Sequence, residues 1–174
     1  MYFKIIKLRF NSATHFGQQG YGLENVREYI SSDTLFSIII NGVAQIYGRQ
    51  KADEIITNFL SNNFLFRISS AFIFNKNNYF LPLPMIEFKQ LEDEELRLKY
   101  LKILKRIEFI PSQIFNKIIT GDQLELENIV EARELYKSSF FITSQPRNEL
   151  DKLTLYSSLY FCSYIKYSDD CGLY

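Results

Sequence analysis

Two Phe- and Ile-rich runs at residues 63–75 and 79–83 are separated by the short polar sequence Asn75-Lys-Asn-Asn78. Asparagine tolerates the left-handed backbone of a tight turn, so this pattern predicts two antiparallel strands joined as a β-hairpin. Pro82 and Pro84 close the second run. Proline lacks a backbone N–H, so the second strand is expected to end there or to lie at a sheet edge. Any fold of this chain must therefore include an antiparallel sheet around residue 76.

The first ten residues predict another strand. Side chains at residues 2–10 alternate between apolar and polar with a period of two, which is the period of a β-strand. One face would be buried and would include Ile6 and Leu8, whereas the other face would be basic and carry Lys7 and Arg9.

Two helices are expected between these strands. Ser31-Ser-Asp-Thr34 supplies capping side chains before an apolar stripe that continues to about Tyr47, where Gly48 offers a C-cap. The stripe is wide, so we expect this helix to be mostly buried. A second helix is expected at about residues 51–60. The order β-α-α-β-β opens an α+β fold of the ferredoxin-like (RRM-like) type with one extra helix.

The second half of the chain predicts a helical insertion and a protruding hairpin. Helical patterns at residues 91–106, 111–120 and 124–136 together indicate an insertion over about 91–136. Strand-like residues 138–143 and 153–167 flank the polar stretch 144–152, which predicts a hairpin with Arg147 and Lys152 near its tip. A new strand begins at Gly172-Leu-Tyr174. We therefore expect residues 1–174 to be a single domain of a truncated chain or a fragment.

Composition excludes several function classes. Of the 174 residues, 47% are hydrophobic, which is enough for one domain with a real core and argues against disorder. Twenty basic residues balance twenty acidic ones, so nucleic acid cannot be held by overall charge and any contact must rest on local patches. Because the sequence has no long apolar run and no signal-peptide h-region, we expect a cytoplasmic protein without a membrane partner.

A metal centre or cofactor is not expected. The chain has one histidine, two cysteines and no CxxC motif, which is a poor ligand set for zinc. Cys162 and Cys171 are interpreted as reduced thiols in or beside a strand, because disulfide frameworks usually have more cysteines and a secreted context.

Residues 11–22 form a loop with glycines at positions 17, 20 and 22. Such a loop can bend sharply and present backbone N–H groups to phosphate, but its spacing matches neither the dinucleotide nor the P-loop fingerprint. On this stretch alone a flexible surface loop is the favoured interpretation. His15 could act as a general base, although a packing or hydrogen-bonding role is favoured. Asp33 could bind a metal, although helix capping is favoured.

Seven segments carry a family resemblance through their order along the chain. They are Ile6-Lys-Leu-Arg-Phe10, His15-Phe-Gly17, Ser32-Asp-Thr-Leu-Phe36, Tyr79-Phe-Leu-Pro-Leu-Pro84, residues 100–110, Pro146-Arg-Asn-Glu-Leu-Asp-Lys152 and Gly172-Leu-Tyr174. Together they resemble the RAMP-superfamily proteins that form subunit four of type III-A CRISPR (Csm) effector complexes. No single segment is specific, but the ordered set extends over nearly the whole chain.

The resemblance implies a non-catalytic subunit that grips the 5′ handle of the CRISPR RNA (crRNA). It also implies that the subunit holds the large polymerase-like subunit against the RAMP backbone subunits. Carried over to this sequence, the RNA-binding candidates are Lys7, Arg9, His15, Gly17, Gly20, Gly22, Ser32, Asp33, Thr34, Arg147, Asn148 and Lys152.

Two departures from the family pattern matter. Leu83 stands between the two prolines, where the family usually has Lys or Arg, and family members are longer, with a second ferredoxin-like module. Two alternatives to an RNA-binding subunit therefore stay open. One is a metal-independent endoribonuclease of the same superfamily that processes precursor crRNA, and the other is a scaffold that binds only protein.

Overall fold

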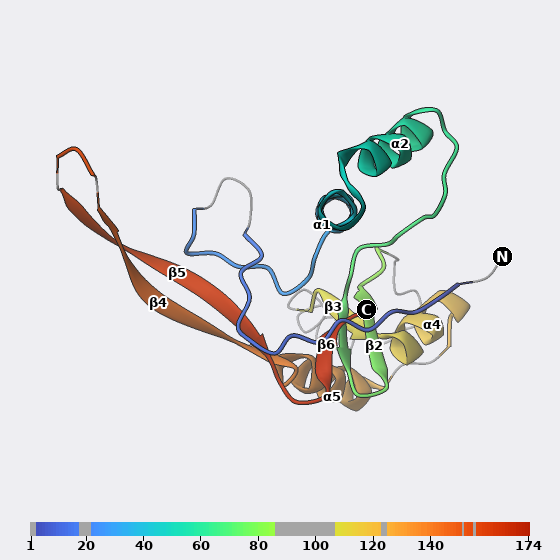
Figure 1. The fold of residues 1–174 in the computed structure, drawn as a ribbon. Helices are drawn as coiled ribbons and strands as arrows, with labels where there is room; N and C mark the ends of the chain where they lie inside the picture. The colour runs from blue at the N-terminus through green and yellow to red at the C-terminus, as the bar shows by residue number, and fades with distance from the viewer. Residues whose placement is uncertain (1–2, 18–21, 86–106, 123–124, 151, 155) are drawn as a thin grey trace. The chain divides into compact units, whose positions relative to one another are not determined.

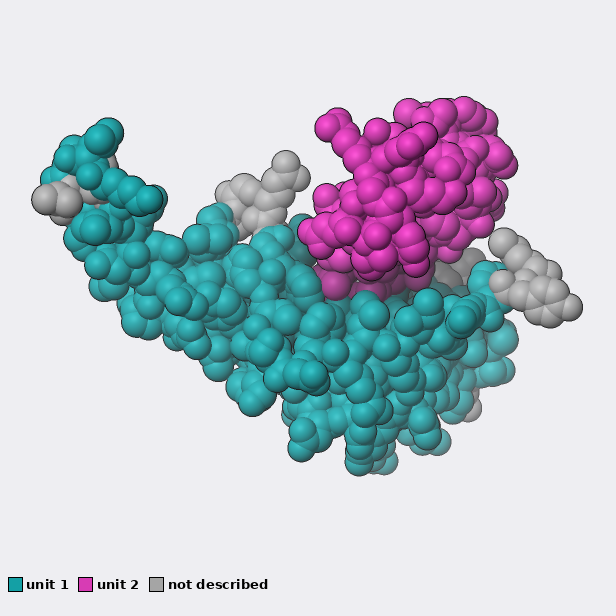
Figure 2. All heavy atoms as spheres, in the orientation of Figure 1, with its two compact units in different colours: residues 1–28, 72–174 teal, residues 29–71 magenta. Residues whose placement is uncertain are grey.

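The computed structural model describes residues 3–17, 22–85, 107–122, 125–150, 152–154 and 156–174 (Figure 1). The chain divides into two compact units, which are described separately (Figure 2). Unit 1 consists of Met1–Glu28 and Phe72–Tyr174, and unit 2 of Tyr29–Ala71. The elements are helices and antiparallel strands, so the expected combination of α and β structure is confirmed at this level.

Unit 1 contains a four-stranded antiparallel sheet in the order β3-β2-β1-β6. The strands are β1 (Ile73–Asn75), β2 (Asn78–Pro82), β3 (Phe109–Pro111) and β6 (Cys171–Leu173). The predicted hairpin is confirmed, with Asn75 opposite Asn78 and Lys76 in the left-handed region at φ 54°. The first run forms a strand over only three residues. Pro82 ends β2, which is a central strand rather than an edge.

Two helices of unit 1 bury a core of branched side chains with strand β3. Helices α4 (Ser112–Thr120) and α5 (Leu126–Lys137) confirm the predictions at 111–120 and 124–136. The predicted helical insertion over 91–136 is wrong in one part, because β3 lies within it and pairs with β2. The helix predicted at 91–106 lies outside the described residues. The core consists of Ile107, Ile110, Ile114, Ile118, Ile129 and Ala132.

A long hairpin, β4 (Phe140–Leu150) with β5 (Ser157–Tyr167), is the second sheet of unit 1 (Figure 1, orange and red). The prediction of a hairpin is confirmed. The predicted turn over residues 144–152 is wrong for its larger part, because residues 144–150 belong to β4. Most side chains of β4 are exposed, so polar residues cost little there. Partners such as Tyr160 and Phe161 on β5 have high strand propensity and stabilise the pairing.

The N-terminal segment of unit 1 is not the regular strand that its alternation predicts. Within the described residues 3–10, only Leu8 makes a β-bridge, with Leu173, through N–H···O bonds of 2.6 and 3.0 Å. The physical reason is that the available edge strand, β6, has only three residues to pair with. Ile6, expected in the buried face, is 61% exposed.

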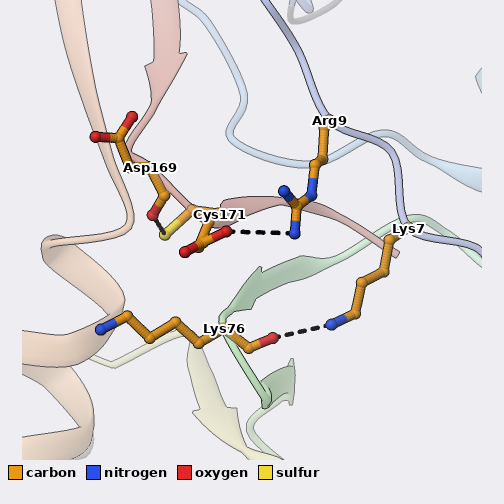
Figure 3. A network of polar contacts seen from close by, with 6 residues as sticks. Lys7, Arg9, Lys76, Asp169 and Cys171 are labelled. Atoms are coloured by element: carbon orange, nitrogen blue, oxygen red, sulfur yellow. Dashed lines mark hydrogen bonds and ion pairs between the residues drawn. The ribbon is translucent and has the colours of Figure 1, made fainter.

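The two basic residues of this segment contact neighbouring turns (Figure 3). The Lys7 ammonium donates to the backbone oxygen of Lys76 at 2.9 Å, and Arg9 forms an ion pair with Asp170 at 3.3 Å. Both acceptor residues have a positive φ. Asp170 lies in the turn that joins β5 to β6, and Lys76 lies in the turn that joins β1 to β2. Both cysteines of the chain are free and buried, as expected.

Unit 2 consists of α1 (Ser32–Tyr47), α2 (Arg49–Leu60) and the segment that follows them. Both predicted helices are confirmed, and Gly48, at φ 88°, caps α1 by donating its N–H to the Ala44 oxygen. The prediction that the first helix is mostly buried is wrong, because no described residue of α1 is buried. Ile30 and Ala71 close the unit through two backbone hydrogen bonds of 3.1 and 2.8 Å. None of the described helices is long and apolar enough to cross a membrane.

Gly172 lets the N-terminal segment approach β6. A Cβ built at Gly172 would collide with the backbone oxygen of Leu8 and would lie 3.1 Å from Cε1 of Phe74. We therefore expect Gly172→Ala to lower the free energy of unfolding by about 1–3 kcal/mol, measured by denaturant titration. Gly42→Ala is the control, because a Cβ there meets nothing within 4 Å and sits inside α1. It should be neutral or stabilise by up to about 1 kcal/mol. A Gly172→Ala chain as stable as the parent would contradict this role.

Candidate functional site

The glycine loop lies along the edge of β5 that is not paired with β4. Thr14 and Ile165 exchange two backbone hydrogen bonds of 2.8 Å each, and the Ser163 N–H donates to the Leu23 oxygen at 3.0 Å. β5 is therefore hydrogen-bonded on both of its edges in this region. Thr14 and Leu23 are the loop residues that bind it. Gly22 adopts φ 66°, which a side chain would strain.

His15 is fixed against β5 by its ring nitrogen. Nδ1 lies 2.7 Å from the backbone oxygen of Ser163, and a carbonyl can only accept, so Nδ1 must carry the proton and donate it. In the neutral ring Nε2 then holds a lone pair. Nε2 lies beside Gly17, where an added Cβ would approach it to 3.1 Å. The Cys162 sulfur is 3.8 Å from Nδ1.

Tyr164 joins His15 to Arg147, and we call these three residues the Tyr164 cluster. The His15 and Tyr164 rings meet edge to face with centroids 6.1 Å apart. The Arg147 guanidinium donates to the Tyr164 hydroxyl at 2.9 Å and lies 5.6 Å from the centre of its ring. That hydrogen bond raises the pKa of Arg147, so the group stays a cation. The structure thus brings together two candidates that are 132 positions apart in the sequence.

The face of the hairpin that carries Arg147 has aromatic side chains, two cations and one carboxylate, Glu149. Side chains alternate along a strand and cross-strand partners share a face, so Arg147 lies with its partner Tyr160 and with Tyr164. Lys166 pairs with Phe141 on the same face, with its ammonium 5.7 Å from the ring centre. Aromatic rings that stack on bases beside cations that meet phosphates are the usual components of a surface for single-stranded RNA.

The other RNA-binding candidates are placed elsewhere. Asn148 lies on the opposite face of the hairpin, where its Oδ1 accepts from the Ser157 hydroxyl at 2.6 Å, and Lys152 is exposed in the turn. Gly20 lies outside the described residues, and Lys7 and Arg9 contact the turns described above.

Ser32, Asp33 and Thr34 are in the first turn of α1, in unit 2. There Ser31, not one of these three, is the N-cap residue, and its side chain makes no capping hydrogen bond. The Thr34 hydroxyl is 2.9 Å from that of Ser31, and the Ser32 N–H donates to the Ser70 hydroxyl at 3.2 Å. Asp33 adds negative charge in the first turn of the helix, where the helix dipole favours it. No group of three or more His, Cys, Asp or Glu side chains in the described part of the chain could hold a metal ion.

Tyr164 is the functional residue that sequence reasoning missed. The chain has twelve tyrosines, and nothing near position 164 distinguishes this one. Its contact with Arg147 depends on the register of β4 and β5, and its contact with His15 depends on the pairing of Thr14 with Ile165.

The fold is a combination of helices and antiparallel strands, and known proteins share it. No family model matches the sequence. The chain is 30% identical over 155 residues to the CRISPR system Cms protein Csm4 of Thermococcus onnurineus, which covers 85% of this chain and 50% of that protein. It is 28% identical over 138 residues to Csm4 of Methanocaldococcus jannaschii, covering 77% of this chain and 35% of the relative.

Solved structures agree. One solved structure is the crystal structure of a Csm1-Csm4 cassette in complex with cA4. The match to one of its chains covers 97% of the present chain and 56% of the matched chain, with a TM-score of 0.64 and 26% identity. A chain of the Csm3-Csm4 subcomplex from the type III-A CRISPR-Cas interference complex, at 19% identity and a TM-score of 0.58, shares the fold. The present chain is a homologue of the Csm4 proteins of type III-A CRISPR systems, and the resemblance seen in the sequence is confirmed. The matched region spans 50% of the Thermococcus onnurineus protein and 35% of the Methanocaldococcus jannaschii protein.

The hydrogen bond from His15 gives a direct test of the cluster. Because the Ser163 oxygen can only accept, we expect the neutral ring to be protonated on Nδ1 and not on Nε2. Long-range ¹H–¹⁵N correlation spectra of the labelled chain report the tautomer, and His15 is the single histidine, so its signals need no assignment. A ring protonated on Nε2 at alkaline pH would contradict the contact with Ser163.

Proposed function

We propose that this chain is a non-catalytic RNA-binding subunit of a type III-A CRISPR interference complex that acts in the cytoplasm. In this proposal it holds the 5′ handle of the crRNA and anchors the large polymerase-like subunit beside the RAMP backbone subunits. Its domain would be the ferredoxin-like RAMP domain expected from the sequence. The homology to Csm4 proteins supports membership in such a complex, and the hairpin supports RNA as the ligand.

The Tyr164 cluster is the observation that carries the RNA assignment. Arg147 is an exposed cation that donates a hydrogen bond to the Tyr164 hydroxyl, so it is oriented before RNA arrives. The chain has no net charge, and a local patch of this kind is what a neutral chain needs to bind a polyanion. Tyr160 and Tyr164 add ring surfaces on which unstacked bases can lie.

Reversing charge on the hairpin tests the RNA assignment. With the chain co-expressed with its partner subunits, Arg147→Glu with Lys152→Glu should lower the amount of co-purifying RNA at least tenfold. The slope of log K against log salt should fall by about 1–2, as expected for two lost phosphate contacts. The control is Arg49→Glu with Lys51→Glu, which reverses two exposed basic residues of α2. Circular dichroism should be native throughout. RNA retention equal to that of the control would reject the assignment and leave a scaffold that binds only protein.

The endoribonuclease alternative is tested on the isolated chain. In the neutral ring Nε2 of His15 would be free of a proton, but that atom lies beside Gly17, and Nδ1 donates to the Ser163 oxygen. We therefore expect a precursor transcript that contains the CRISPR repeat to stay intact without added metal, measured on denaturing gels. Cleavage that His15→Ala abolishes would overturn the non-catalytic proposal.

A further inference from the structure

Unit 2 contains an open apolar cavity that the RNA-binding proposal does not use. Its volume is about 640 Å³, within the range of ligand and peptide grooves. Four phenylalanines and Leu60 are among the residues that line it. The phenylalanines are Phe36 of α1, Phe59 of α2, and Phe64 and Phe66 of the following segment.

The aromatic cluster gives the cavity a preformed shape. Phe59 is its centre, with ring centroids 4.8 Å from Phe36, 5.5 Å from Phe64 and 5.1 Å from Phe66. Such edge-to-face and tilted contacts fix ring orientations beyond simple burial. The cavity is therefore built by α1, α2 and residues 64–68 acting together, all within unit 2.

Unit 2 leaves much apolar surface uncovered. Among its described residues only Ile30, Ala52 and Ala71 are buried apolar side chains, and two of these close the base of the unit. Leu60 beside the cavity is 80% exposed, and Ile46 on α1 is 73% exposed. An apolar cavity beside exposed apolar side chains is typical of sites that another molecule covers.

The charges around the cavity favour a protein and not RNA. Helix α1 has no lysine or arginine, so it offers no cationic side chain to a phosphate backbone. The lining has one carboxylate, Asp33, and one guanidinium, Arg67, which lies 5.5 Å from the Phe64 ring centre. An occupant that complements this pair must be apolar with one basic and one acidic group. An amphipathic protein helix has this composition and docks into grooves through side chains spaced by three or four residues.

We propose that the cavity of unit 2 docks an amphipathic helix of a partner protein subunit, with apolar side chains against Phe59 and opposite charges facing Asp33 and Arg67. This inference rests on the proposed function, because it assigns a surface to the anchoring of a neighbouring subunit. RNA is held by the hairpin of unit 1, so the two ligands use different units.

A matched pair of substitutions tests the docking site. Leu60→Glu and Ile46→Glu each place a charge at a highly exposed apolar position of a unit 2 helix, but only Leu60 lines the cavity. The full chain is co-expressed with the large polymerase-like subunit and, separately, with a backbone subunit from the same source. For the subunit that binds the parent chain, Leu60→Glu should weaken the affinity between chain and subunit at least tenfold, and Arg67→Glu should weaken it severalfold. Ile46→Glu should change the same affinity by less than threefold. Circular dichroism checks that each variant folds.

The same preparations separate this inference from the RNA assignment. Leu60→Glu should leave RNA retention unchanged, and the hairpin variant with Arg147→Glu and Lys152→Glu should leave subunit binding unchanged when RNA is removed by nuclease. Equal effects of Leu60→Glu and Ile46→Glu, or no effect of either, would overturn the docking site. Loss of RNA with Leu60→Glu while the subunit stays bound would also overturn it and would identify the cavity as an RNA site.

Discussion

The candidate site depends on the fact that β5 is hydrogen-bonded on both of its edges. One edge pairs with β4 along eleven residues, and the other meets Thr14 and Leu23 of the glycine loop. Ile165, at the crossing of these contacts, is fully buried and fixes the strand in place. A shift of one residue in either pairing would turn Tyr164 to the other face and would separate Arg147 from His15.

A second set of contacts attaches the base of the hairpin to the rest of unit 1. The Tyr167 hydroxyl donates to the Glu28 backbone oxygen at 2.8 Å, and the Tyr136 hydroxyl donates to the Glu28 carboxylate at 3.1 Å. Burial, together with the nearby Glu28 charge, raises the pKa of both tyrosines, so both remain donors over the physiological pH range. Asn75 adds bonds of 3.3 and 3.0 Å to the Leu135 oxygen and to the buried Ser139 hydroxyl. The exposed outer hairpin therefore begins from a rigid base.

Local signals predicted the elements, but not how distant segments meet. The C-cap at Gly48, the turn at Asn75–Asn78 and the helices α4 and α5 are encoded within a few neighbouring residues, and each was predicted. The N-terminal alternation suggested a full strand, because the sequence does not reveal that β6 is only three residues long. The polar stretch at 144–150 suggested a turn, because its strand state depends on partners seven to nineteen positions away. His15 and Arg147 were identified as candidates from their local context, whereas Tyr164 gains its role only from strand register.

The closure of unit 2 by Ile30 and Ala71 makes that unit a detachable module of the chain. Residues hydrogen-bonded across two antiparallel segments have Cα atoms about 5 Å apart, so the chain leaves and returns at nearly the same point. A few residues of linker would span that gap at a small cost in loop entropy. The 40 amino acids between the two anchors can therefore be lengthened, shortened or exchanged while the pairings that set the Tyr164 cluster stay intact. Such an arrangement allows the surface of unit 2 to change together with a neighbouring protein, without altering the hairpin.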